Sequence, residues 1–423
     1  MSTVRLILVT LISASPVILL WDGLIVRGLV AGILAVALAI TAQTLRPGES
    51  EFLVSIIRPL TAVAAVPALW LLVQLLPLRL LAHPIWKDAE TALGSPLAGT
   101  ISVDPGASVI ALGQYLSVIA VAFLSAAVSV DRQRAEWILF ALTAAVAAIA
   151  LMILTPLATF TRAQAIDCVG IGTIIASAAC IRTIERYETR RSSPQRSVPI
   201  LLLTVVACSG ALAICGAVVM LGATREILIA TAYGIFALTY ISIIRRFALG
   251  AIGTTAIAAP ALGAAILFLA YHQTERGTSV PFVFAGASDP SLIALSERVL
   301  HDAPLVGTGA GTFAALAPIY RQIDDPPPGS TAVTAAATFA IELGRPMFWL
   351  ITVATAGYIV ILLRAALRRG RDSFYPAMGG SCLITLLLLS FNNAGLFGMA
   401  SSLISAAVIG LAIAQSKSRT AKA

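Results

Sequence analysis

Long apolar runs, separated by short polar connections, constrain this chain more than any other feature. The stretches 201–221 and 250–270 contain no Asp, Glu, Lys or Arg, and neither alternates between apolar and polar positions. A helix of about 20 apolar residues crosses the hydrocarbon core of a bilayer and satisfies its own backbone hydrogen bonds there. A membrane β-barrel instead needs strands of about ten residues with alternating polarity. The runs therefore predict a helical membrane protein and exclude a barrel.

Charged residues are too few for a soluble protein of this length. They make up 11% of the 423 residues, whereas a soluble domain carries about 25%. The net charge of +8 would by itself suit a nucleic-acid-binding protein. Because the basic residues lie in the short connections between apolar runs, they match the positive-inside pattern of membrane proteins instead. We therefore predict membrane lipids as the surroundings and no nucleic-acid partner.

The predicted fold is all-α. Residues 1–423 are expected to form a single integral membrane domain, a polytopic transmembrane helical bundle with about 12 spans. The first apolar run is expected to be retained, because no small-residue cleavage site follows it. The expected spans are 5–21, 28–45, 58–77, 107–129, 137–157, 165–182, 199–220, 227–244, 249–270, 346–363, 376–390 and 395–414.

The distribution of arginine and lysine predicts the orientation. With the N-terminus in the cytoplasm, the arginine-rich connections 182–198 and 364–372 and the basic C-terminus all fall on the cytoplasmic side. This predicts a multi-pass protein of the bacterial inner (plasma) membrane with both termini cytoplasmic. Two long loops, 78–106 and 271–345, are then periplasmic. Loops of such length usually carry function unless they are disordered.

The larger loop is expected to be partly helical. The tripeptide Ser-Asp-Pro at 288–290 is typical of an N-cap followed by a first-turn proline, so a helix is expected to begin there. A second helix is expected from Ser330 to Leu343. Gly344 would end this helix and Pro346 would open the next span.

The same loop contains a glycine-rich stretch formed by Gly307, Gly309 and Gly311. It lacks the Gly-Lys-Ser/Thr ending of an ATP-binding loop. One interpretation is a flexible tight turn. The other is a row of exposed backbone N–H groups that bind a phosphate or diphosphate.

Two arginines, Arg225 and Arg298, are expected on the outer side of the membrane. The planar guanidinium group of arginine can bind phosphate oxygens in two places at once. The alternatives are that Arg225 pairs with Glu226 or snorkels to the membrane surface, and that Arg298 lies on a solvated helix face.

His301 is the candidate for proton transfer, because histidine titrates near neutral pH. A single loop histidine is more often structural, and Glu342 and Asp302 are alternative proton acceptors. The five cysteines lie in or beside apolar runs without a CxxC motif or a Cys/His cluster. They are therefore expected to pack in the core, and no metal site is predicted.

The stretch 298–313, RVLHDAPLVGTGAGTF, followed by Tyr320 and by 341–344, IELG, resembles the large outer loop of the O-antigen ligase and polymerase family. That family includes exopolysaccharide polymerases. The segment from Trp86 to 101–105 is similar to the first outer loop of its polymerase members. The span number, the cytoplasmic termini and the large loop between late spans also resemble the family.

The resemblance implies a metal-independent membrane glycosyltransferase that needs no cofactor and acts in O-antigen, lipopolysaccharide or exopolysaccharide biosynthesis. Its donor would be a glycan linked to undecaprenyl diphosphate, and its acceptor another glycan or the lipid A–core. The resemblance implies that Arg225 and Arg298, with the glycines of 307–311, bind the diphosphate. Fixed cations there would stabilise the negative charge of the leaving group. His301 and Glu342 would be catalytic, and polysaccharide export or chain-length proteins are candidate partners.

Family members commonly carry an Ala-His-Asn-like element ahead of the Glu-x-Gly sequence. Here the matching region, 333–338, reads VTAAAT and contains no histidine. The role of that histidine is then lost, taken by His301 or Glu342, or not needed.

Two other functions stay open. One is a transporter or flippase for lipid-linked oligosaccharide or another solute, and the other is a non-catalytic member of an export complex. No repeat relates the two halves of the chain, and the polar residues Gln43, Gln74, Asn392 and Asn393 do not outline a transport route. Polymerase and ligase differ only in the acceptor, and the first outer loop favours polymerase.

Overall fold

The computed structural model describes residues 2–45, 47–155, 162–191, 198–246, 280–282, 285, 289–322, 327, 329, 331–368 and 373–417, and the regular secondary structure within them is helical. Within these residues, eight helices are long and apolar enough to cross a membrane. They are α3 (Leu24–Thr44), α4 (Pro47–Leu75), α6 (Pro105–Val128), α7 (Arg132–Leu154), α8 (Arg162–Arg191), α9 (Val198–Gly222), α10 (Arg225–Arg246) and α15 (Arg345–Arg368). These helices confirm the predicted polytopic helical bundle.

The N-terminal region differs from its prediction. Instead of one span over 5–21, the structure has two short helices, α1 (Ser2–Ser13) and α2 (Ser15–Leu20), with Pro16 in the first turn of α2. A helix of 12 residues is about 18 Å long, which is too short for a hydrocarbon core of about 30 Å. The predicted helix over 5–21 is therefore interrupted at Ala14, and a membrane crossing by this region stays a prediction.

Two further boundaries need correction. The helix predicted to begin at 58 begins instead at Pro47 and continues through Pro59 and Pro67. The last two predicted spans are short helices, α16 (Phe374–Ser390) and α17 (Met399–Ala414), joined by a non-α-helical segment that includes η2 (Gly395–Phe397). We call 391–398 the α16–α17 break. The predicted span 249–270 lies outside the described residues, so a count of 12 spans stays a prediction.

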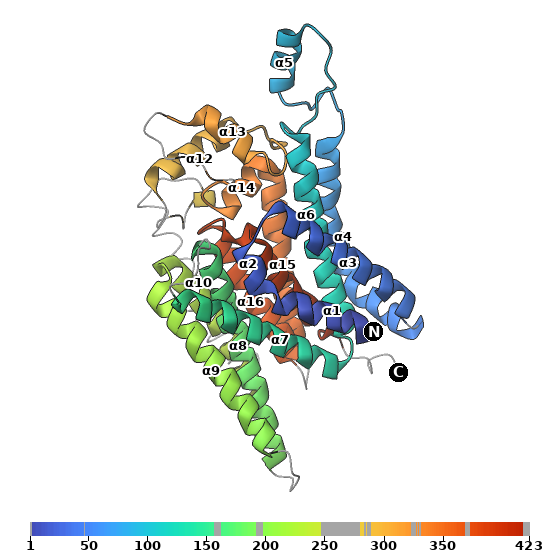
Figure 1. Ribbon diagram of the computed structural model, residues 1–423, viewed down its shortest axis with the longest axis vertical. Coiled ribbons are helices and arrows are strands. Elements are labelled where there is room, and N and C mark those ends of the chain that lie inside the picture. Colours follow the sequence, from blue (N-terminus) through green and yellow to red (C-terminus); the bar gives the residue numbers. More distant parts are fainter. Residues whose placement is uncertain are drawn as a thin grey trace.

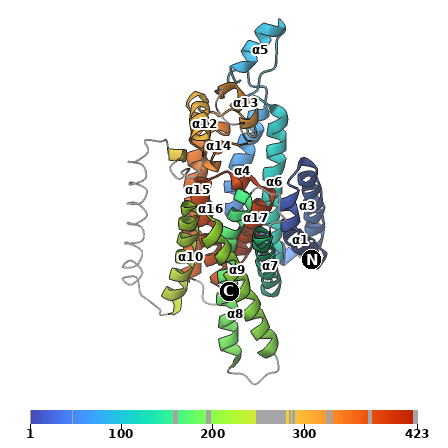
Figure 2. The ribbon, with the colours of Figure 1, turned by 60° about the vertical axis from the view of Figure 1, so that its left-hand side comes forward.

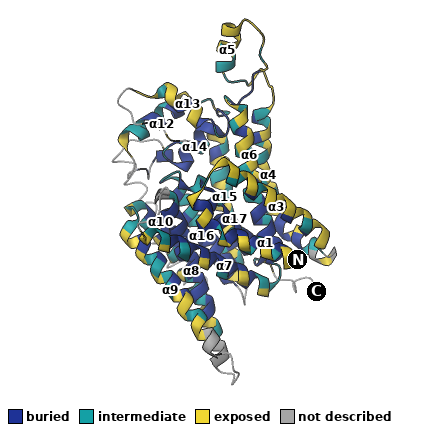
Figure 3. Ribbon diagram, in the orientation of Figure 1, coloured by how far each residue is buried: buried dark blue, intermediate teal, exposed yellow. Residues whose placement is uncertain are grey.

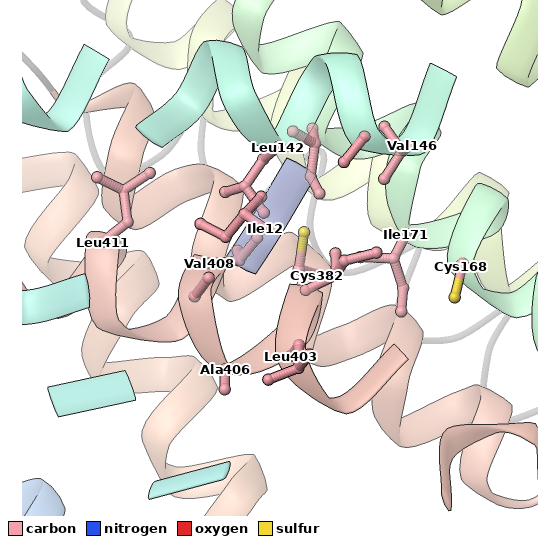
Figure 4. Close-up of a cluster of buried hydrophobic side chains, with 14 of the residues drawn as sticks. Ile12, Leu142, Val146, Cys168, Ile171, Cys382, Leu403, Ala406, Val408 and Leu411 are labelled. Carbon is pink, nitrogen blue, oxygen red and sulfur yellow. The ribbon is translucent and has the colours of Figure 1, made fainter. Parts of the chain in front are cut away.

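The core of the bundle joins helices that are far apart in the sequence. Figure 4 shows Ile12 of α1, Leu142 of α7, Ile171 of α8 and Leu403 of α17 in one cluster, and all four are buried. All five cysteines are buried with free thiols, as their apolar surroundings predict.

Large apolar side chains that are exposed gather instead on α3, α4, α9 and α15, where Ile25 and Leu221 are each more than three-quarters exposed. Figure 3 shows such exposed positions along these helices. An apolar surface of this extent suits contact with lipid.

Three short helices form a compact unit at one end of the bundle (Figure 1). They are α12 (Pro290–Asp302), α13 (Phe313–Tyr320) and α14 (Ala335–Glu342), and we call them, with the turn 303–312, the loop unit. Its apolar core includes Val299, Phe313 and Ile341 and continues to Phe348 of α15. The loop unit is therefore packed directly on a membrane-spanning helix.

The boundaries of α12 and α14 follow from their capping residues. The side chain of Asp289 caps α12 by accepting the N–H of Ser291 at 3.0 Å, with Pro290 in the first turn as predicted. The helix α14 is shorter than predicted, because Thr334, not Ser330, is its N-cap. Gly344 ends it as predicted, with a φ of +90°.

The other long connection, 78–106, carries the short helix α5 (Ile85–Leu93), which has no buried residue. It stands away from the rest of the molecule in both ribbon views (Figures 1 and 2). The return segment leads to Asp104, whose side chain caps α6 by accepting the N–H of Ala107 at 3.0 Å.

Candidate functional site

The glycine-rich stretch is a tight turn that only glycine can form. Gly307, Gly309 and Gly311 have φ angles of +84°, +104° and +76°, a region that side chains disfavour. A Cβ atom at Gly309 would lie 2.6 Å from the Cα of Ser102, and one at Gly307 would lie 2.6 Å from the backbone N of Gly344. The turn is therefore pressed between the end of α14 and the segment that precedes α6.

Glu342, the last residue of α14, holds this turn. Its Oε2 accepts the N–H of Gly311 at 2.8 Å, and its Oε1 accepts the N–H of Phe313 at 3.2 Å. Its backbone carbonyl accepts the N–H of Gly309 at 3.0 Å. Burial raises the pKa of Glu342 to about 7, because its effect exceeds that of the hydrogen bonds from Gly311 and Phe313, which lower the pKa. The group thus exchanges a proton near neutral pH, although its carboxylate is buried.

The N–H groups of the three glycines all have protein acceptors. Gly307 donates to the carbonyl of Pro304 at 2.9 Å, Gly309 to the carbonyl of Glu342, and Gly311 to the carboxylate of Glu342. A diphosphate could take the donor of Gly311 only by displacing Glu342. Binding of the diphosphate by these glycines stays a prediction.

The first long connection completes this site. Val103 donates its N–H to the carbonyl of Thr308 at 2.9 Å, and the Ser108 hydroxyl donates to the carbonyl of Ala310 at 2.8 Å. Ser102 and Ser108 share a hydrogen bond of 2.7 Å between their hydroxyl groups. The two long connections predicted from the sequence therefore meet at the glycine-rich turn.

Two residues near the end of α4 also reach the site. The side-chain amide of Gln74 donates to the backbone carbonyl of Glu342 at 2.9 Å, and the indole N–H of Trp70 donates to that of Leu343 at 2.9 Å. In the sequence, Gln74 is a polar residue within a predicted span. Its position in an apolar run indicates that the amide is buried, and a buried amide needs hydrogen-bond partners from other segments.

Arg298 and His301 lie on α12, beside this turn in the same loop unit. The Nε of Arg298 donates to the carbonyl of Tyr320 at 3.2 Å, so the guanidinium reaches toward α13. His301 is exposed, and its Nδ1 lies 3.0 Å from a carboxylate oxygen of Asp302. The structure gives neither residue a hydrogen bond or ion pair with Glu342 among the described residues.

Arg225 lies in another part of the molecule, as the first residue of α10. It is exposed, and α10 begins at the end of the bundle that carries the loop unit (Figure 2). No hydrogen bond joins it to Arg298, His301 or Glu342 within the described part of the chain. The structure thus assembles Glu342 with the three glycines, and leaves Arg298 and His301 on α12 and Arg225 on α10.

The sequence gives no indication of one buried polar group, the carboxyl of Asp167. Asp167 of α8 is fully buried, and its Oδ1 accepts a hydrogen bond from Nδ2 of Asn393 at 3.0 Å. In the sequence Asp167 stands at the start of a span, where an acidic residue reads as a helix end exposed to water. The structure instead covers it with the α16–α17 break.

The described residues include no group of three or more His, Cys, Asp or Glu side chains that could hold a metal ion. No protein-family model matches the chain, and no curated protein matches it. Function is therefore inferred from the geometry of these residues and from the sequence resemblance.

Proposed function

We propose that the protein is a membrane glycosyltransferase of the O-antigen polymerase and ligase type, acting at the periplasmic face on a glycan linked to undecaprenyl diphosphate. One observation carries the proposal. The two segments that resemble the family meet in one hydrogen-bonded unit. Ser102 of the first segment packs against Gly309 of the second, whose N–H donates to the carbonyl of Glu342. Arg298 lies on α12 of the same loop unit, and Arg225 is the first residue of α10.

The proposed reaction needs little covalent chemistry from the protein. The oxygen of the acceptor hydroxyl attacks the anomeric carbon, the bond from this carbon to the diphosphate oxygen breaks, and undecaprenyl diphosphate leaves with the electron pair. Arg225 and Arg298 stabilise the growing charge on the leaving oxygen. The hydroxyl proton passes to a base.

We infer that His301 is that base and that Glu342 holds the turn. His301 is exposed and its ring nitrogen lies 3.0 Å from Asp302, a carboxylate that can orient it. Both carboxylate oxygens of Glu342 already accept backbone N–H groups. Glu342 thereby fixes the backbone beside α12, and a direct proton transfer would first have to break these bonds.

Deletion of the gene in its host, followed by analysis of surface glycans and extracted lipid-linked glycans, tests the function. Loss of polymer, with single repeats left on lipid or core, would identify a polymerase. Long chains left on undecaprenyl diphosphate, with bare core, would identify a ligase. An unchanged profile in a host without a second copy would contradict both.

The two arginines can be tested in the same assay. Replacing Arg225 or Arg298 by Ala should abolish product at unchanged protein level, and Lys should restore little, because it cannot bind two phosphate oxygens in one plane. Arg79, an exposed arginine of the first long connection, is the matched control, and R79A should keep full activity. Full activity of both R225A and R298A would contradict the assignment of the diphosphate site.

A transporter for lipid-linked oligosaccharide is the second candidate. The observation that favours it is Asp167, a carboxyl group buried within a span beside the interruption between α16 and α17. Buried acids and interrupted helices are typical of transport sites. Accumulation of lipid-linked repeats on the cytoplasmic leaflet of the deletion strain would support this function over glycosyl transfer.

A further inference from the structure

The α16–α17 break covers a carboxyl group that lacks a cationic partner. Asp167 is fully buried, and its Oδ1 has one neutral partner, the Asn393 amide. The other oxygen, Oδ2, has no hydrogen-bond partner among the described residues. It lies against Gly395, where a Cβ atom would collide with it. The side chain of Asn393 is itself held, because its Oδ1 accepts the N–H of Gly395 at 2.7 Å.

Among the described residues, no charged group forms an ion pair with this carboxyl. The segment 391–398 and α17 contain no titratable side chain. On the other side of the break, Asp22 is paired with Arg27 at 2.7 Å and accepts the N–H of Met399. Arg225 and Glu226 begin α10, which packs on α8, and neither forms an ion pair with Asp167 in the described ranges. The next residue of α8, Cys168, is a buried thiol, and α16 carries the thiol of Cys382 and the phenol of Tyr375.

An ionised carboxylate in such a place is strongly disfavoured. Removing a charge from water without a counter-charge costs far more than one hydrogen bond to an amide returns. The usual resolution is that the group takes up a proton and becomes neutral. The hydrogen bond from Asn393 is compatible with a neutral acid, since the carbonyl oxygen of the acid still accepts it.

We propose that Asp167 is a proton-binding site: the carboxyl carries a proton taken from water, and the neutral acid holds the segment 391–398 against α8. Loss of this proton would leave an unpaired charge beside Gly395, which favours opening of the break. The backbone carbonyl of Asn393 accepts the N–H of Ala335 at 3.0 Å, at the start of α14. A proton at Asp167 is thus linked to the helix that ends at Glu342. The inference does not depend on the proposed function.

Infrared spectroscopy of the full-length protein in nanodiscs tests this directly. At about pH 6, ordinary Asp residues are ionised, so a protonated-carboxyl band from aspartate should arise only at an unusual site. We expect such a band in wild type, shifted when aspartate carries ¹³C in its side-chain carboxyl. The label separates Asp167 from Glu342, which also holds a proton near neutral pH. The band should be lost in D167N and kept in the control D22N.

A second pair of variants assigns the band without removing the carboxyl. G395A places a methyl group against Oδ2 and should shift the labelled band, whereas G216A should not, since a Cβ at Gly216 meets nothing within 4 Å. Absence of a labelled band in wild type, or its survival in D167N, would overturn the proposal. A further outcome is that sodium chloride, but not choline chloride, raises the melting temperature of wild type and leaves that of D167N unchanged. This result would identify the bound ion as sodium and would also overturn the proposal.

Discussion

Gly309 of the loop unit has no room for a side chain. Its φ of +104° is strained for any other residue, and a Cβ would lie 2.6 Å from the Cα of Ser102. We expect G309A to destabilise the protein by about 1–3 kcal/mol, from strain and overpacking together. Thermal unfolding of the purified protein measures this loss.

The control for G309A is Gly113 of α6, where an added Cβ meets nothing within 4 Å. Because alanine is the better helix former by about 1 kcal/mol, G113A should be neutral or stabilising. Equal losses in the two variants would mean that the close approach to Ser102 is absent in solution.

Glu342 predicts a pH dependence of stability. Its pKa rises from the ordinary 4.5 to about 7 in the folded protein. Between these values the folded protein keeps a proton that the unfolded chain has lost, so this contribution to stability falls as pH rises through about 7. The melting temperature should therefore drop from acidic to mildly alkaline pH, and E342Q, which stays neutral, should flatten the drop. A slope unchanged by E342Q would show that other groups cause it.

At the scale of single elements, α14 depends on its N-cap. The hydroxyl of Thr334 accepts the N–H of Ala337 at 3.0 Å and donates to the carbonyl of Pro281 at 2.9 Å. A helix of eight residues is not stable alone. We expect T334A to cost about 1 kcal/mol and to speed hydrogen exchange in α14, with T334S close to wild type. T91A, in the exposed helix α5, should leave exchange in α14 unchanged, and an equal effect of T91A would contradict the capping role.

The elements that the sequence predicts well are those with one dominant local cause. The spans at α6, α7 and α9 follow from apolar length, and the start of α12 follows from Asp289 and Pro290. The end of α14 follows from Gly344, whose φ of +90° needs glycine.

Other features depend on contacts between distant residues, which no local pattern contains. The apolar run 5–21 gives no sign that α1 will lie against α7 as a short helix. Gln74 donates a hydrogen bond to Glu342, and Ser102 packs against Gly309, in each case more than two hundred residues later in the chain. Asp167 looks like an ordinary helix end, because only the folded chain places Asn393 and Gly395 over it. The sequence therefore singles out Glu342 and the three glycines, but not the hydrogen bonds that join them.

For the whole molecule, the buried cysteines make the predicted orientation testable. Because all five native thiols are buried, a membrane-impermeant thiol reagent should label wild type weakly. We expect T91C, in exposed α5, to be labelled in spheroplasts, and K417C, near the C-terminus, only after permeabilisation. The basis is the clustering of basic residues on the predicted cytoplasmic side. Labelling of both from the same side would overturn the predicted topology.

The direct junction between α14 and α15 has a consequence for the lipid. Only Leu343 and Gly344 separate Glu342 from the start of α15. At 24 residues, α15 is about 36 Å long, longer than an average hydrocarbon core of about 30 Å. Such a helix adapts to a thinner bilayer by tilting further. The tilt carries Glu342 and the glycine-rich turn with it, so bilayer thickness sets where the site stands above the bundle.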